Sequence, residues 1–170
     1  MNIQDLNRLD KEIGDLFIKI QMLTNDSKSD TEIIKYLTNH TVLLISAYID
    51  KYFLFIIEDC IGRRTIPEEL KNFILSKIKG RQGLTNLDSK KIKGILSDFN
   101  EGWSTSLSAY IDSNNNQSTA LGNIVGTRNK IAHGNSIVDI SINNYMEDYK
   151  DAKKLLNHVK TFFDSIDGIR

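Results

Sequence analysis

The stretch LLISAYIDKYFLFII, from Leu43 to Ile57, decides which fold this sequence can adopt. Its apolar residues point in almost every direction around a helix, so a helix here needs neighbours on several sides. We therefore predict a long central helix over about residues 31 to 60 that other helices cover. Asp50 is an acid inside this apolar run, and we expect it to be buried too.

Helical spacing of apolar residues continues on both sides of this segment, and strict alternation is almost absent. A first helix is predicted over residues 3 to 20, followed by a polar exit at residues 25 to 29. Ser29 and Glu32 have the spacing of a capping box, in which a hydroxyl and a carboxylate bind free amides at a helix start. The central helix should begin there and end at Gly62.

The second half of the chain predicts shorter helices around the same core. Their expected bounds, in chain order, are Pro67 to Gly80, residues 88 to 99, residues 103 to 111, a cap at Ser118 or Thr119 to Gly134, and residues 143 to 166, with a loop at residues 114 to 117. The predicted fold class is all-α. It is one domain, residues 1 to 170, built as a helical bundle of about five main helices and one or two short ones.

Composition excludes several classes of protein. The chain has 170 residues, of which 40% are hydrophobic and 26% charged, enough for one core without disulfides or structural metals. One cysteine and three histidines cannot form an internal disulfide or a Cys/His zinc centre. We expect no cofactor and no metal.

Charge is balanced overall but uneven along the chain. The 22 basic and 22 acidic residues argue against binding of nucleic acid through bulk charge. Residues 63 to 93, however, contain nine basic and three acidic residues. This segment is either a solvated face or a surface for phosphates, and both interpretations remain open.

The sequence gives no sign of a membrane protein. No stretch reaches the roughly 18 to 20 uninterrupted apolar residues that a membrane helix needs, and Asp50 and Lys51 interrupt the closest one. The first residues lack the basic and then apolar order of a secretory signal. We expect a cytoplasmic protein without a membrane partner.

Polar chemistry is concentrated in the segment LGNIVGTRNKIAHG, residues 121 to 134. Asn129 and His133 are four residues apart and share a helix face, while the long Arg128 side chain starts to one side of it. An arginine fork suits a phosphate, and Lys130 adds a further charge. His133 is expected at the negative helix end, which favours a protonated imidazole. The segment predicts a proton-transfer group beside an anion clamp.

A purely structural interpretation of these residues is also open, in which Arg128 pairs with a carboxylate and His133 caps the helix. The other reactive side chains indicate less. Cys60 is expected to be an inert buried thiol, and His40 and His158 to be packing or surface residues. Trp103 is expected in the core, although an exposed indole would suit RNA.

Residues Arg128 to Gly134, RNKIAHG, resemble the signature of the HEPN superfamily, an arginine followed by a polar residue and later by a histidine. The surroundings agree with this resemblance: an early helical hairpin, an apolar helix with Asp50, the signature helix late in the chain and a closing helix. The resemblance covers about residues 30 to 166. It is closest to the RiboL-PSP-like and related defence-associated branches.

This resemblance implies a metal-independent endoribonuclease in which Arg128 and His133 are catalytic and Asn129 is a polar helper. It also implies a toxin of a toxin–antitoxin or anti-phage system, with a cognate antitoxin that is often nucleotidyltransferase-like. Other HEPN domains are non-catalytic binding or scaffolding modules, and this alternative remains.

RNA cleavage without a metal uses the 2′-hydroxyl as nucleophile and needs a base, an acid and positive charge on the transition state. One chain offers one motif histidine, so a homodimer would place two His133 and two Arg128 around one phosphate, which resembles the composite site of the family. The products would carry 2′,3′-cyclic phosphate and 5′-hydroxyl ends. Asp50 is the candidate acid that orients Arg128, with a structural role in the core equally open. Lys130, residues 63 to 93 and Trp103 are candidate RNA contacts.

Overall fold

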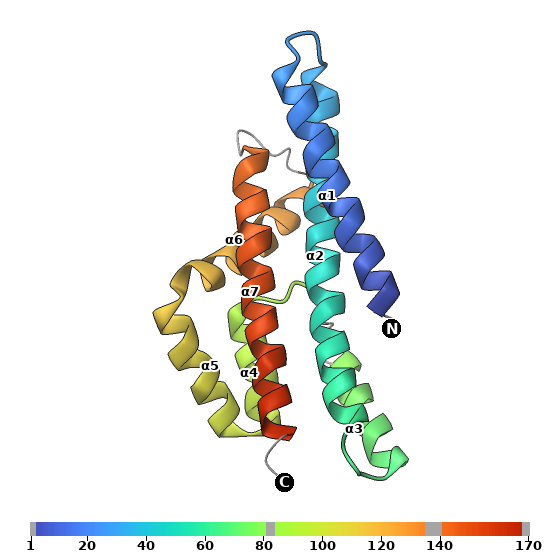
Figure 1. The fold of residues 1–170 in the computed structure, drawn as a ribbon, viewed down its shortest axis with the longest axis vertical. Coiled ribbons are helices and arrows are strands. Elements are labelled where there is room, and N and C mark those ends of the chain that lie inside the picture. The colour runs from blue at the N-terminus through green and yellow to red at the C-terminus, as the bar shows by residue number, and fades with distance from the viewer. Residues whose placement is uncertain (1–2, 81–83, 135–140, 168–170) are drawn as a thin grey trace.

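The computed structural model describes residues 3–80, 84–134 and 141–167, which form seven helices and no strand (Figure 1). Buried apolar residues from every helix meet in one core. The predicted all-α, single-domain bundle is therefore confirmed. The helices are α1 (Ile3–Asn25), α2 (Thr31–Gly62), α3 (Glu68–Gly80), α4 (Ser89–Phe99), α5 (Glu101–Ser113), α6 (Asn115–Ala132) and α7 (Ile142–Asp167).

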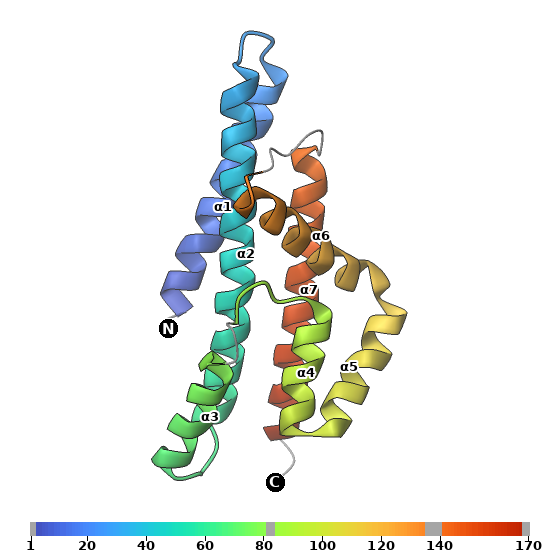
Figure 2. The ribbon, with the colours of Figure 1, turned by 180° about the vertical axis from the view of Figure 1, so that it is seen from behind.

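The predicted central helix is α2, the longest helix in the described part of the chain. Helices α1, α6 and α7 pack against it on different sides, as Figures 1 and 2 show from opposite directions. The α1–α2 hairpin extends beyond the other helices at one end of the molecule (Figure 1). Three neighbouring helices thus cover the apolar residues 43 to 57, which spread around most of the helix circumference, as this pattern requires.

By length and composition alone, α2 is the one described helix that could cross a membrane, with a mean hydropathy of 1.5 in its most apolar window. Half of that window is buried inside the domain. A core helix has the same properties, so this finding is weak evidence for a membrane span.

One predicted helix cap and one predicted helix start are wrong, and side-chain contacts explain both. Asp30, not Ser29, caps α2, because its carboxylate accepts a 2.8 Å hydrogen bond from the Glu32 amide. Ser29 instead donates its hydroxyl hydrogen to Asp26, 3.3 Å away. Asp is as good a cap as Ser, so the choice depends on the preceding turn.

The asparagine-rich residues 114 to 117 are not a loop. Asn114 occupies the position before α6 without a capping side-chain hydrogen bond, and α6 begins at Asn115, ahead of the predicted start. Asn116 donates to the Asp151 carboxylate of α7 at 2.7 Å, and the buried Gln117 accepts a hydrogen bond from Tyr110 at 3.1 Å. These tertiary contacts favour a helix where local propensity favours a turn.

Several single-residue predictions about packing are confirmed. Cys60 is a buried thiol. Trp103, Phe99 and Tyr110 pack against the core while remaining partly accessible. His40 is exposed on α2, and His158 stacks on Tyr110 with ring centroids 3.4 Å apart.

Candidate functional site

The helix α6 and the residue that follows it carry the four polar residues that the sequence singles out. The inner face of α6, with Leu121, Ile124 and Thr127, is buried and packs on α7 and α2. The helix ends at Ala132, and the backbone amide of His133 donates to the Asn129 carbonyl at 3.1 Å. The predicted left-handed terminator is confirmed, because the residue after His133 is Gly134 with φ of 78°.

Arg128 is half-buried on the flank of α6. Its Nη1 donates to Oδ1 of Asn129 at 3.3 Å. Within the described residues, this guanidinium forms no ion pair with a carboxylate. The described residues therefore do not show the salt bridge that the structural interpretation of Arg128 requires. Most N–H groups of the guanidinium stay available to an anion.

His133 is exposed at the C-terminal end of α6. Only its backbone takes part in ending the helix, and the imidazole makes no hydrogen bond within the described part of the chain. Asn129, which holds Arg128, lies one turn earlier on the same face. The helix thus gathers a guanidinium, an amide and an imidazole at one end, and Lys130 is exposed beside them.

Gly122 and Gly126 continue this face away from His133. A Cβ atom added at either glycine would meet nothing within 4 Å. The outer surface of α6 is therefore low and open, so a large molecule can approach the helix closely. Gly126 lies three residues before Asn129 and four before Lys130, so it shares their side of the helix.

Asp50 lies on α2 and holds the loop between α3 and α4. Its two carboxylate oxygens accept hydrogen bonds from the backbone amides of Asn86 and Leu87, both at 3.1 Å. Asn86 has φ of 57°, a left-handed conformation that asparagine tolerates better than most residues. Sequence reasoning did not find this loop anchor, because nothing in residues 84 to 88 indicates a distant carboxylate.

Burial raises the pKa of Asp50 from 3.8 to about 6, while the two amides and then the positive charges of Lys91 and Arg128 oppose the shift. Arg128 thus acts on Asp50 through space, without an ion pair between them. The expectation that Asp50 is buried holds in part, since it is half-buried. Its role in orienting Arg128 stays a prediction.

Part of the positive charge of residues 63 to 93 is neutralised by ion pairs within the domain. Arg63 pairs with Asp164 at 2.7 Å and Lys79 with Glu58 at 2.9 Å. The Arg64 guanidinium lies 5.3 Å from the centre of the Trp103 ring. Arg81 lies outside the described residues.

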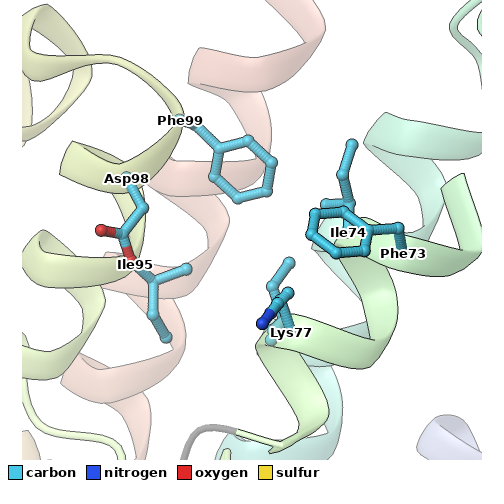
Figure 3. Close-up of a pocket in the computed structure, with 7 residues that line it drawn as sticks. Phe73, Ile74, Lys77, Ile95, Asp98 and Phe99 are labelled. Carbon is cyan, nitrogen blue, oxygen red and sulfur yellow. The ribbon is translucent and has the colours of Figure 1, made fainter. Parts of the chain in front are cut away.

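An apolar groove separates α3 from α4 in this segment (Figure 3). Its volume is about 450 Å³. Phe73 is 56% exposed, and the ammonium of Lys77 lies 5.4 Å from the centre of its ring. The full lining consists of Phe73, Ile74, Lys77, Ile78, Ile95, Asp98 and Phe99. An aromatic face beside a lysine is a combination that can hold an unpaired base and its phosphate.

A search for His, Cys, Asp and Glu clusters suited to a metal finds none in residues 3–80, 84–134 and 141–167. Among known protein families, the one described as RiboL-PSP-HEPN matches residues 4–165, nearly the whole chain. Comparison with curated proteins and with solved structures gives no match.

Proposed function

The chain belongs to the RiboL-PSP-HEPN family, and from this premise we propose that it is a metal-independent endoribonuclease. HEPN domains are associated with ribonuclease or nucleotide-related functions, and the family assignment supports this broader class. One observation carries the finer proposal: a half-buried arginine without a carboxylate partner among the described residues is tied to Asn129, one turn before an exposed histidine at the helix end.

In this proposal Arg128 and Lys130 bind the non-bridging oxygens of the scissile phosphate. A neutral His133 imidazole takes the proton of the 2′-hydroxyl, whose oxygen then attacks phosphorus. The bond to the 5′-oxygen breaks, and that oxygen takes a proton from a protonated imidazole. The products carry 2′,3′-cyclic phosphate and 5′-hydroxyl ends. Arg128 stabilises the charge that develops on the phosphorane-like transition state.

The two proton transfers need two groups, and each chain offers one motif histidine. We therefore place the reaction in a homodimer, where His133 of one copy is the base and His133 of the other is the acid. Asn129 fixes the position of the Arg128 fork through its hydrogen bond. Asp50 contributes at longer range, by its charge and by holding the loop before α4.

The groove between α3 and α4 is the proposed contact for unpaired RNA flanking the cleaved bond. Phe73 would stack on a base and Lys77 would bind a phosphate. We further propose that the protein is a cytoplasmic toxin of a toxin–antitoxin or anti-phage system. A cognate antitoxin would restrain it, and a nucleotidyltransferase-like protein is the candidate. This role rests on the family alone.

The test is cleavage of a structured RNA by purified protein in EDTA. We expect wild-type protein to cut it and the Arg128→Ala and His133→Ala variants to lose activity by at least a hundredfold, with unchanged helicity and melting temperature. Arg8→Ala is the matched control, because Arg8 is an exposed arginine on α1. Should no RNA be cut, and should the two site variants melt several degrees lower, these residues hold helices together and the chain is a scaffolding module.

A further inference from the structure

Lys91 is the third residue of α4 and lies beside the groove between α3 and α4. Ile95 follows it by four residues and Asp98 by seven, so the three side chains share one side of the helix. Ile95 and Asp98 line the groove. In Figure 3, Lys77 of α3 lies opposite Ile95, at the end of the groove away from Phe99. Lys91 starts about 6 Å beyond Ile95 along the helix axis, so it lies at this same end.

Lys91 is also close to the polar end of α6. Its positive charge acts on the Asp50 carboxyl, and so does the charge of Arg128. Because charge effects near a surface fade over about 10 Å, both cations lie near Asp50. Neither forms an ion pair with that carboxyl in the described part of the chain, where the Asp50 oxygens accept hydrogen bonds from the amides of Asn86 and Leu87. Lys91 thus stands between the groove and the arginine proposed to bind the scissile phosphate.

The groove and the end of α6 are reached from the same face of the molecule. In Figure 2, α6 crosses the near side, the loop that precedes α4 lies below its C-terminal half, and α4 runs down from that loop. The hydroxyl of Ser118 on α6 donates to that of Ser89 on α4 at 2.8 Å, which holds the start of α4 against α6. A strand of RNA that extends from the end of α6 to the groove therefore passes the first turn of α4.

We propose that Lys91 binds a phosphate of the substrate RNA between the nucleotide held in the groove and the phosphate that is cleaved. The proposal rests on the proposed ribonuclease function and names the residue that joins its two contact regions. Lys91 is exposed, and its ammonium donates one hydrogen bond, to the Thr85 carbonyl at 2.9 Å. An ammonium has three N–H donors, so two stay available for phosphate oxygens. The Thr85 carbonyl fixes where the ammonium lies.

The neighbouring Lys90 distinguishes a placed lysine from charge alone. It is exposed as well, but successive residues of a helix point about 100° apart. Gly94, one turn after Lys90, does not line the groove. Neither lysine forms an ion pair within residues 3–80, 84–134 and 141–167. If the charge of residues 63 to 93 attracts RNA without regard to position, the two lysines contribute equally; in our proposal Lys91 contributes far more.

Binding of an RNA that cannot be cleaved measures the phosphate contact apart from catalysis. A single-stranded 2′-O-methyl oligonucleotide lacks the 2′-hydroxyl nucleophile, and fluorescence anisotropy gives its affinity at several salt concentrations. Loss of one phosphate contact lowers the slope of log affinity against log salt by about 0.7, so the deficit grows about fivefold from about 1 M to 0.1 M salt. We expect this loss for Lys91→Ala, recovery in Lys91→Arg and almost no change for the matched control Lys90→Ala. Helicity should stay unchanged in all three, because both side chains are exposed.

RNA cleavage separates failure of this contact from failure of the proposed function. Lys91 binds a phosphate that does not react, so Lys91→Ala should raise KM about fivefold and leave kcat unchanged. A protein that cuts RNA, but whose salt slope is the same in wild type and Lys91→Ala, refutes the contact and keeps the ribonuclease. A protein that cuts no RNA, but whose salt slope falls in Lys91→Ala, keeps the contact and refutes the ribonuclease.

Two further results would overturn the proposal. Equal losses in Lys90→Ala and Lys91→Ala would show that charge alone, without a defined position, attracts the RNA. A wild-type protein that binds no single-stranded RNA would show that no phosphate is held on this face.

Discussion

Replacement of Asp50 by asparagine should remove a pH dependence of stability that the wild-type chain shows between about pH 4 and pH 6. Burial raises the pKa of this carboxyl from 3.8 to about 6, despite hydrogen bonds from the amides of Leu87 and Asn86. A difference of about two pKa units corresponds to about 3 kcal/mol. We reduce this to about 2 kcal/mol because Asp50 retains some contact with solvent.

The sign follows from where the proton is held. Between about pH 4 and pH 6 the folded chain keeps the Asp50 proton while the unfolded chain has lost it. The folded state therefore binds more protons, and the contribution of Asp50 to the free energy of unfolding falls as the pH rises through this window. Above about pH 6 the contribution is constant. The amide side chain of the Asp50→Asn variant does not bind a proton in this range, so residue 50 makes no pH-dependent contribution to the free energy of unfolding of the variant.

Urea unfolding followed by circular dichroism at several pH values between 4 and 7 measures the effect. The free energy of unfolding of wild type minus that of Asp50→Asn should fall by about 2 kcal/mol across this range. The lost hydrogen bond of the variant shifts the whole difference but does not depend on pH. Asp112→Asn, at an exposed aspartate of α5, is the matched control substitution. A constant difference for Asp50→Asn would refute the assignment of this carboxyl as a buried, penalised charge.

Three further substitutions test separate features. Arg128→Lys keeps the charge but loses the fork that binds Asn129 and a phosphate, so RNA cleavage should fall at least tenfold in a rate assay, without a change in melting temperature. Gly134→Ala forces a left-handed backbone, φ of 78°, on a residue with a Cβ; unfolding should show a loss of about 1 kcal/mol, and cleavage should fall because His133 moves. Tyr149→Phe removes a 2.7 Å hydrogen bond to Asp10 between α7 and α1, which should cost about 1 kcal/mol in urea unfolding and leave cleavage unchanged.

The helices could be predicted because their evidence is local. The apolar run around Tyr48 and Phe53 requires a covered helix whatever surrounds it, and Gly134 marks a helix end through its own backbone freedom. The start of α6 could not be predicted in this way. Asn116 and Gln117 favour a turn by themselves, and become helical because Asp151 and Tyr110 bind their side chains from other helices.

In the candidate site, too, the local features could be predicted from the sequence and the contacts with distant residues could not. The order of Arg128, Asn129 and His133 on one helix end follows from their spacing, and the structure places them as the spacing indicates. The surroundings of Asp50 do not follow from spacing, because its partners are backbone amides of residues 86 and 87. A backbone amide has no residue identity, so a sequence gives no sign of which carboxylate it will bind.

The second proton-transfer group must come from outside the chain if the proposed chemistry is correct. His158 is stacked on Tyr110 with ring centroids 3.4 Å apart, and burial lowers its pKa, which favours the neutral imidazole. Asp50 has a pKa near the range for proton transfer, but each of its oxygens already accepts a backbone amide. His40 is exposed on α2. In the proposed homodimer, the second His133 supplies this group. For that reason, loss of the dimer and loss of His133 should abolish cleavage to the same extent.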